Sequence, residues 1–113
     1  KGEVAEASGD NIFIVKDDII KTPPVSCGAL EGLTRNKVME LAVNAGFNVS
    51  EEVLSRYDLY TADEVFLTGT AAEIISVVEI DKRSIANGKT GIISTKLAKM
   101  YSDYVSVSGH KID

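Results

Sequence analysis

The sequence predicts a mixed α/β domain built from short strands and packed helices. Short runs rich in β-branched residues, such as Ile12–Val15 and Ile74–Ile80, are bounded by turns containing Gly, Pro, Asn or Asp. An apolar stripe at helical spacing lies between these runs. The 113 residues, 44% hydrophobic and 26% charged, are enough for one domain with its own core and too few for two.

Charge and composition narrow the range of partners and compartments. The formal net charge is −5 and the isoelectric point is near 4.8, without a cluster of Lys and Arg, so we expect no nucleic-acid partner. No apolar run reaches membrane-spanning length and no signal peptide is evident, so we expect no membrane partner. The single Cys27 excludes an internal disulfide and fits a cytoplasmic protein.

The first predicted strand, Glu3–Ser8, contains an acid in an unusual position. Glu6 lies two residues after Val4, so in a strand both side chains point to the same side. A carboxylate that points where an apolar side chain points is unusual in a strand.

A β-hairpin is predicted next. Ile12–Val15 and Ile19–Ile20 form its strands around Asp17 and Asp18, although the favoured Asp-Gly pair is absent. Adjacent acids can bind a metal, but acids in a turn are usually solvated, so we predict no metal site. The prolines that follow end the hairpin.

A helix is predicted to start near Thr34 and to stop at Gly46. Gly32-Leu33-Thr34 offers unpaired N–H groups and a hydroxyl at its N-terminus, and Arg35 adds positive charge, which together favour an anion. A plain N-cap role for Thr34 explains the same residues. The apolar stripe of this helix consists of Val38, Leu41, Ala42 and Ala45.

A second anion-binding turn is predicted after the strand that begins at Asp63. Val65–Leu67 is a short apolar run, and Gly69-Thr70-Ala71 then offers backbone N–H groups, a hydroxyl and little bulk. An ordinary glycine loop between two strands is the alternative. Two small turns that each carry a threonine make a shared phosphate site more plausible than either turn alone.

The remaining elements are predicted from shorter patterns. Phe47–Val53 is predicted to be a strand with Glu51 and Glu52 in solvent, and Ser55 to open a short helix through a capping box with Asp58. Ile74–Ile80 is predicted to be a buried strand, followed by a weak strand around Ile85. The last helix carries Ile93, Leu97, Met100, Tyr101 and Tyr104 on one face, before a frayed tail from Val105 that includes His110.

These residues also carry a resemblance to a known family. Glu6, Asn11 and Phe13, then Ile20 and Thr22, then Leu30-Glu31-Gly32-Leu33-Thr34-Arg35 resemble the signature of the class IV pyridoxal-phosphate aminotransferases in residue type and spacing. The stretches Leu54–Phe66 and Thr68–Glu73 are similar to the branched-chain amino acid aminotransferases in particular. The similarity covers most of the chain.

The resemblance implies a fold, a cofactor and site residues. The fold would be the pseudo-barrel C-terminal domain of the D-amino acid aminotransferase-like enzymes, and the cofactor pyridoxal 5'-phosphate. Glu6 matches the carboxylate that pairs with the pyridine nitrogen, while Leu33, Thr34 and Thr70 match the phosphate cradle. Thr70 and Ala71 match the substrate-carboxylate position, and Asn11 and Arg35 match residues that support the others.

The resemblance further implies a parent enzyme that exchanges amino groups between branched-chain amino acids and 2-oxoglutarate, in a homodimer or higher homo-oligomer. The family's Schiff-base lysine precedes the strand of Glu6, and no lysine here matches it, so we expect this chain to be a C-terminal domain (1–113) without a catalytic residue of its own, its N-terminal domain lying elsewhere. The sequence departs from the family pattern at Asp18, usually Gly, and after Gly91, where Pro is common.

Alternatives remain at this stage. D-amino acid aminotransferases and aminodeoxychorismate lyases share the fold and the first motif. A non-catalytic domain that binds a phosphate ligand or a protein partner is the alternative from another class.

Overall fold

The computed structural model describes residues 3–4, 11–24, 32–68, 74–77, 79–80, 83–85 and 91–108. Strands and helices alternate irregularly, which confirms the predicted mixed α/β class. The elements are β1 (Glu3–Val4), β2 (Asn11–Lys16), β3 (Ile19–Thr22), α1 (Leu33–Asn44), β4 (Asn48–Glu51), β5 (Leu54–Ser55), α2 (Arg56–Tyr60), β6 (Glu64–Thr68), β7 (Ile74–Val77), β8 (Glu79–Ile80), β9 (Arg83–Ser84) and α3 (Ile92–Ser108).

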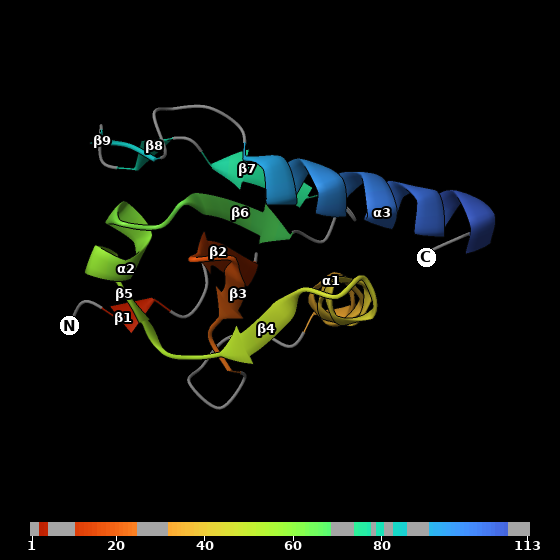
Figure 1. Cartoon of the computed structure of the whole chain (residues 1–113), viewed down its shortest axis with the longest axis horizontal. Coiled ribbons are helices and arrows are strands. Elements are labelled where there is room, and N and C mark those ends of the chain that lie inside the picture. The colour runs from red at the N-terminus through yellow and green to blue at the C-terminus, as the bar shows by residue number, and fades with distance from the viewer. Residues whose placement is uncertain are drawn as a thin grey trace.

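A five-stranded mixed sheet organises the domain. Its strand order is β4-β3-β2-β6-β7, with only the β3–β4 pair parallel (Figure 1). The described residues also form two small antiparallel sheets, β1-β5 and β8-β9. Inner strands β2 and β6 are buried on both faces, so their successive side chains feed two separate cores.

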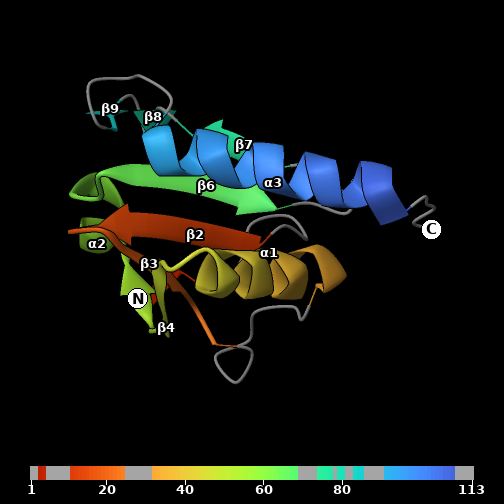
Figure 2. The ribbon, with the colours of Figure 1, turned by 45° about the vertical axis from the view of Figure 1, so that its right-hand side comes forward.

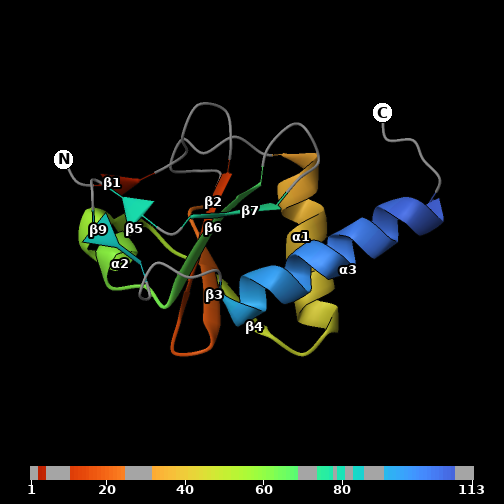
Figure 3. The same cartoon turned by 90° about the horizontal axis from the view of Figure 1, so that it is seen from above.

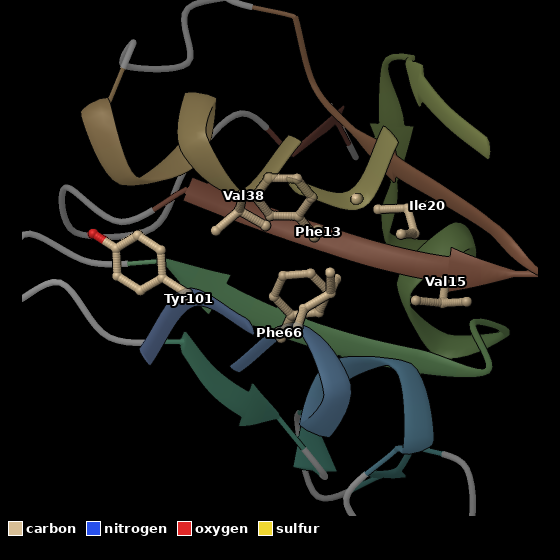
Figure 4. Close-up of a cluster of buried hydrophobic side chains, with 8 residues drawn as sticks. Phe13, Val15, Ile20, Val38, Phe66 and Tyr101 are labelled. Carbon is tan, nitrogen blue, oxygen red and sulfur yellow. The ribbon is translucent and has the colours of Figure 1, made fainter. Parts of the chain in front are cut away.

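Helices α1 and α3 cover one face of this sheet. Phe13 of β2 and Phe66 of β6 stack there with ring centroids 4.9 Å apart, and Val38 of α1 and Leu97 and Tyr101 of α3 pack around them (Figure 4). Offset aromatic pairs add to the free energy gained from burying their area. This core therefore holds the two helices in place on β2 and β6.

The opposite face is covered by smaller elements. Ile12 and Ile14 of β2 and Val65 of β6 pack there against Leu54 of β5 and Leu59 of α2, and Ala62 and Ile85 complete this cluster. Figure 3 shows the resulting layers, with α2 and β5 on one side of the strands and α1 and α3 on the other, and Figure 2 shows α1 running beside β2 and α3 beside β6. The sheet is therefore the middle layer of the domain.

The predicted β2–β3 hairpin is confirmed. Asp17 and Asp18 form its two-residue turn with φ angles of 53° and 66°, the left-handed conformations that a type I′ turn requires. The Asp17 N–H donates a hydrogen bond of 2.9 Å to the Asp63 carboxylate. The turn is thereby tied to the residue that precedes β6.

The capping and stop signals at two helices are also confirmed. Ser55 and Asp58 form the predicted capping box of α2. Gly46 follows α1 with a φ of 96°, the conformation expected of a glycine that ends a helix. Ala45, however, was wrongly placed in the apolar stripe, because α1 ends at Asn44 and Ala45 is exposed.

Two boundaries differ from the sequence prediction. The stretch predicted as one buried strand divides into β7 and β8, and β7 lies at the edge of the sheet with Ile75 46% exposed. β-branched composition indicates a strand but not its position in a sheet. Helix α3 continues to Ser108, past the expected fraying point at Val105, because its polar residues there weaken the apolar pattern without breaking the helix.

Candidate functional site: a polar sheet edge beneath a helix N-terminus

Buried polar side chains gather where three inner strands of the five-stranded sheet begin or end. This edge of the sheet runs across the strand ends and not along an outer strand. Asn11 begins β2 and Thr68 ends β6, and the two residues lie opposite each other in the antiparallel register. Thr22 ends the neighbouring strand β3. All three side chains are at least 96% buried, and all point to the α1 face, since Phe13, Ile20 and Phe66 two residues away pack there.

Asn11 joins this edge to the start of α1. A Cβ atom placed on Gly32 would lie 2.7 Å from the Asn11 Oδ1, closer than real Cβ contacts allow. A side chain at position 32 would therefore have to displace the Asn11 amide. The N-terminus of α1 is packed directly over the end of β2.

The first backbone N–H groups of α1 have no acceptor within the helix. Gly32 is the N-cap residue, and it has no side chain to accept a hydrogen bond from the first turn. The Asn36 N–H donates to the Gly32 carbonyl at 3.0 Å, and helix geometry leaves the N–H groups of Leu33, Thr34 and Arg35 without intrahelical acceptors. The first turn contains no acidic residue, so its partial positive charge is open to an anion.

Thr34 is not the helix cap. It is the second residue of α1, so the N-cap interpretation of its hydroxyl is wrong. Its Oγ1 instead lies 3.3 Å from the Tyr101 hydroxyl of α3. The Thr34 hydroxyl is therefore placed at the helix start by a contact with the other long helix.

Arg35 links the start of α1 to the ends of β3 and β4 through hydrogen bonds. Its guanidinium is 3% exposed and donates to the carbonyl of Pro23 at 3.0 Å and to Glu51 at 2.7 Å, and its Nη1 donates to Asn36. Glu51 ends β4 beside Thr22 in register. The Glu51 side chain is 46% exposed, in agreement with its predicted position in solvent. It also forms an ion pair with Arg35, which the sequence did not indicate.

A second cation lies on the next part of α1. The Lys37 ammonium donates to Glu40 at 3.0 Å and lies 4.5 Å from the ring centroid of Tyr104. The hydrogen bond to Glu40 raises the pKa of Lys37 above its usual value. Arg35 and Lys37 thus place two cations on the first half of α1, each paired with a carboxylate.

Two buried polar atoms at this edge lack partners in the part of the chain that the structure describes. They are the Oγ1 of Thr68 and the Nε of Arg35. The Thr22 hydroxyl, by contrast, donates to the Ile12 carbonyl at 2.7 Å. Sequence reasoning assigned no role to Thr22 or Thr68. The available signals were a threonine that ends a strand on the side of the apolar core and the place of both residues in the stretches that resemble the family.

Only some of the predicted site residues can be placed. The structure brings together Asn11, Arg35, Thr34 and the backbone of Leu33. Glu6, Thr70 and Ala71 lie outside the described residues, so the convergence of Thr34 and Thr70 stays a prediction. Thr68, two positions before Thr70, lies at the sheet edge over which α1 begins.

The described ranges offer neither a metal centre nor a membrane-spanning helix. They contain no group of three His, Cys, Asp or Glu residues arranged to hold a metal ion. No helix within them is long and apolar enough to cross a membrane.

Comparison with known proteins gives consistent matches. The family model for amino-transferase class IV matches residues 1–80. The chain is 52% identical over 112 residues to a putative branched-chain-amino-acid aminotransferase of Methanocaldococcus jannaschii. This alignment covers 99% of this chain and 39% of the relative. It is 48% identical over 106 residues to the branched-chain-amino-acid aminotransferase of Pseudomonas aeruginosa, covering 94% and 34% of the two chains.

Solved structures agree with these matches. A branched-chain amino acid aminotransferase from T.th. with pyridoxamine 5'-phosphate aligns with a TM-score of 0.89 at 42% identity, over 96% of this chain and 36% of that chain. The Thermoproteus uzoniensis enzyme, solved with norvaline, aligns with a TM-score of 0.88 at 42% identity, over 96% and 36%. This chain thus spans between a third and two fifths of the length of these relatives.

Proposed function

Since the chain belongs to the amino-transferase class IV family, we propose that it is the cofactor-holding domain of a branched-chain amino acid aminotransferase. Residues 1–113 would form one C-terminal domain of a longer enzyme, as the partial coverage of its relatives supports. The enzyme would exchange amino groups between leucine, isoleucine or valine and 2-oxoglutarate. The names of the relatives favour this branch over D-amino acid aminotransferases and aminodeoxychorismate lyases.

The cofactor would be pyridoxal 5'-phosphate, and the start of α1 fits its phosphate. The contact between Gly32 and Asn11 carries this proposal. It sets an uncapped helix N-terminus on a buried polar sheet edge, where the N–H groups of Leu33 and Thr34 can bind an anion. The Thr68 hydroxyl, which has no partner among the described residues, is consistent with a site built for a further polar group.

The other residues follow from the family match. Bound pyridoxal phosphate would supply the group that accepts and passes on the amino group. Glu6 would hold a proton on the pyridine nitrogen through opposite charge. Thr70 would complete the phosphate contacts, and the Ala71 N–H would help to hold the substrate carboxylate. Asn11 and Arg35 would keep the start of α1 in place.

Binding of the phosphate group tests this proposal. We expect isothermal titration calorimetry to detect binding of pyridoxal 5'-phosphate to the chain and competition by inorganic phosphate. Pyridoxal, which lacks the phosphate, should bind far more weakly. Equal affinity for pyridoxal and pyridoxal phosphate would contradict a phosphate cradle.

Two glycine variants locate the cradle. Gly32→Ala puts a Cβ against the buried Asn11 side chain, so either that side chain or the start of α1 must shift. Phosphate affinity should then fall by about tenfold or more, equivalent to about 1.4 kcal/mol. Gly46→Ala is the matched control at the other end of α1, where a φ of 96° strains the backbone but no atom lies within 4 Å of the new Cβ. It should lower stability by about 1 kcal/mol and leave phosphate affinity unchanged. Similar affinities for both variants would rule out the start of α1 as the site.

A further inference from the structure

The contact between Thr34 and Tyr101 joins the proposed phosphate cradle to α3. We propose that Tyr101 is a positioning residue of this cradle, which acts by donating a hydrogen bond to the Thr34 hydroxyl. This inference rests on the proposed function, because it gives a role to a residue beside the same phosphate site. Neither the sequence pattern nor the family match assigned Tyr101 more than a place in the core.

Tyr101 is held where this role requires. Its ring is 8% exposed and belongs to the core formed with Phe13, Phe66 and Val38. Figure 4 shows its hydroxyl at the outer end of that cluster, directed away from the two phenylalanine rings. The ring of Tyr104 packs beside it, with centroids 6.1 Å apart. The core therefore fixes the ring and leaves only the hydroxyl at the polar end.

The chemistry of the two hydroxyls sets the direction of the hydrogen bond. Each hydroxyl has one hydrogen to donate and two lone pairs. When an anion binds at the helix start, the Thr34 hydrogen is needed by an anion oxygen, so Thr34 must accept from Tyr101. Phenol O–H groups are better donors than aliphatic ones, and a chain of two hydrogen bonds that ends on a negative charge strengthens both.

The distance between the two hydroxyl oxygens leaves room for the hydrogen bond to shorten on binding. The two oxygens are 3.3 Å apart, longer than the usual distance of about 2.8 Å for hydroxyl pairs. Without an anion, either hydroxyl can be the donor. With an anion bound, donation from Tyr101 to Thr34 and from Thr34 to the anion is the one arrangement in which both hydroxyls and the anion are hydrogen-bonded. Before binding, the contact with Tyr101 limits the rotation of the Thr34 side chain.

Phosphate titration followed by nuclear magnetic resonance tests this role. The probes are the backbone amide of Thr34 and the ¹³Cζ signal of Tyr101 in chain labelled at tyrosine. Both signals should move with inorganic phosphate and saturate at the same concentration, since the Tyr101 hydroxyl becomes polarised as the anion binds. A tyrosine that only fills the core would show no such change.

Three variants separate the role from packing. Tyr101→Phe keeps the ring, and the phosphate dissociation constant should rise by about three- to tenfold, as for one lost hydrogen bond. Tyr104→Phe is the matched control, one turn further along α3 with its ring against Lys37, and should bind phosphate as the unaltered chain does. Thr34→Val should abolish the Tyr101 response, and adding Tyr101→Phe to it should weaken binding no further.

The outcomes distinguish this inference from the proposed function. If the Thr34 amide reports phosphate binding while Tyr101 does not respond and Tyr101→Phe binds normally, Tyr101 has no positioning role but the cradle stands. A loss in Tyr101→Phe that persists in the Thr34→Val background would also overturn it. If the unaltered chain does not bind phosphate at Thr34, both the cradle and the role of Tyr101 are wrong.

Discussion

Asp18 occupies a backbone conformation that glycine adopts without a steric cost. Its φ of 66° at the second turn position of the β2–β3 hairpin lies in the left-handed region. Asp18→Gly should therefore raise the free energy of unfolding by about 0.5 to 1 kcal/mol, measured by urea denaturation. The gain comes from relieving the folded backbone and is partly offset by the greater entropy of the unfolded glycine chain.

The alanine variant at the same position should change the free energy of unfolding in the opposite direction. Asp18→Ala keeps a Cβ but loses the polar side chain that makes the left-handed region accessible to Asp, so it should lower stability by about 0.5 to 1 kcal/mol. If Gly and Ala shift stability in the same direction, the backbone angle is not the cause of either effect.

Individual site residues could be predicted only where a local pattern marks them. The pairing of Gly32 with Thr34 at a helix start is such a pattern. The ion pair between Arg35 and Glu51 and the burial of the Thr68 hydroxyl depend on which strands become neighbours. Local sequence patterns do not show which strands become neighbours, so these two features could not be predicted.

At the scale of elements, Glu64 of β6 is the cap of α3. Its carboxylate accepts hydrogen bonds from the backbone N–H groups of Ile93 at 3.0 Å and Ser94 at 2.7 Å, and from the Ser94 hydroxyl at 2.8 Å. A Cβ on Gly91 would overlap this carboxylate. The start of α3 is thus fixed to the sheet by an acid at a helix N-terminus, where negative charge is favourable.

Removing this charge should destabilise the domain. Glu64→Gln keeps the shape but weakens three charge-assisted hydrogen bonds, so the free energy of unfolding should fall by about 1 to 2 kcal/mol. Asp103→Asn is the control on α3 itself. Among the described residues Asp103 makes one ion pair, an exposed contact of 3.4 Å with Lys99, so its loss should change stability by about 0.5 kcal/mol or less. Equal losses in the two variants would show that Glu64 does not hold α3.

Elements with strong local signals were the ones predicted correctly. The β2–β3 hairpin, the stop at Gly46 and the Ser55–Asp58 capping box follow from residues a few positions apart. The burial of β7 was predicted wrongly because its β-branched residues would suit either a central or an edge strand. Tertiary contacts decide that choice.

For the whole molecule, one sheet edge relates the separate motifs. Asn11, Thr22 and Thr68 end or begin three adjacent strands, and α1 starts above them. The sequence predicted two anion-binding turns and proposed that they meet, but it could not show which edge they share. The register of β2 with β6 now places Thr68 of the second motif opposite Asn11, which contacts the first.

The most direct measurement is a phosphate titration of the uniformly ¹⁵N-labelled chain that follows every backbone amide. If α1 and the turn after β6 form one cradle, the amides of Leu33, Thr34 and Thr70 should shift together and fit a single dissociation constant, while amides of the Asp17–Asp18 turn stay unchanged. If phosphate moves the α1 amides and leaves Thr70 where it was, or moves the two sets at different concentrations, the two motifs do not form a common site and the proposed cofactor cradle is wrong.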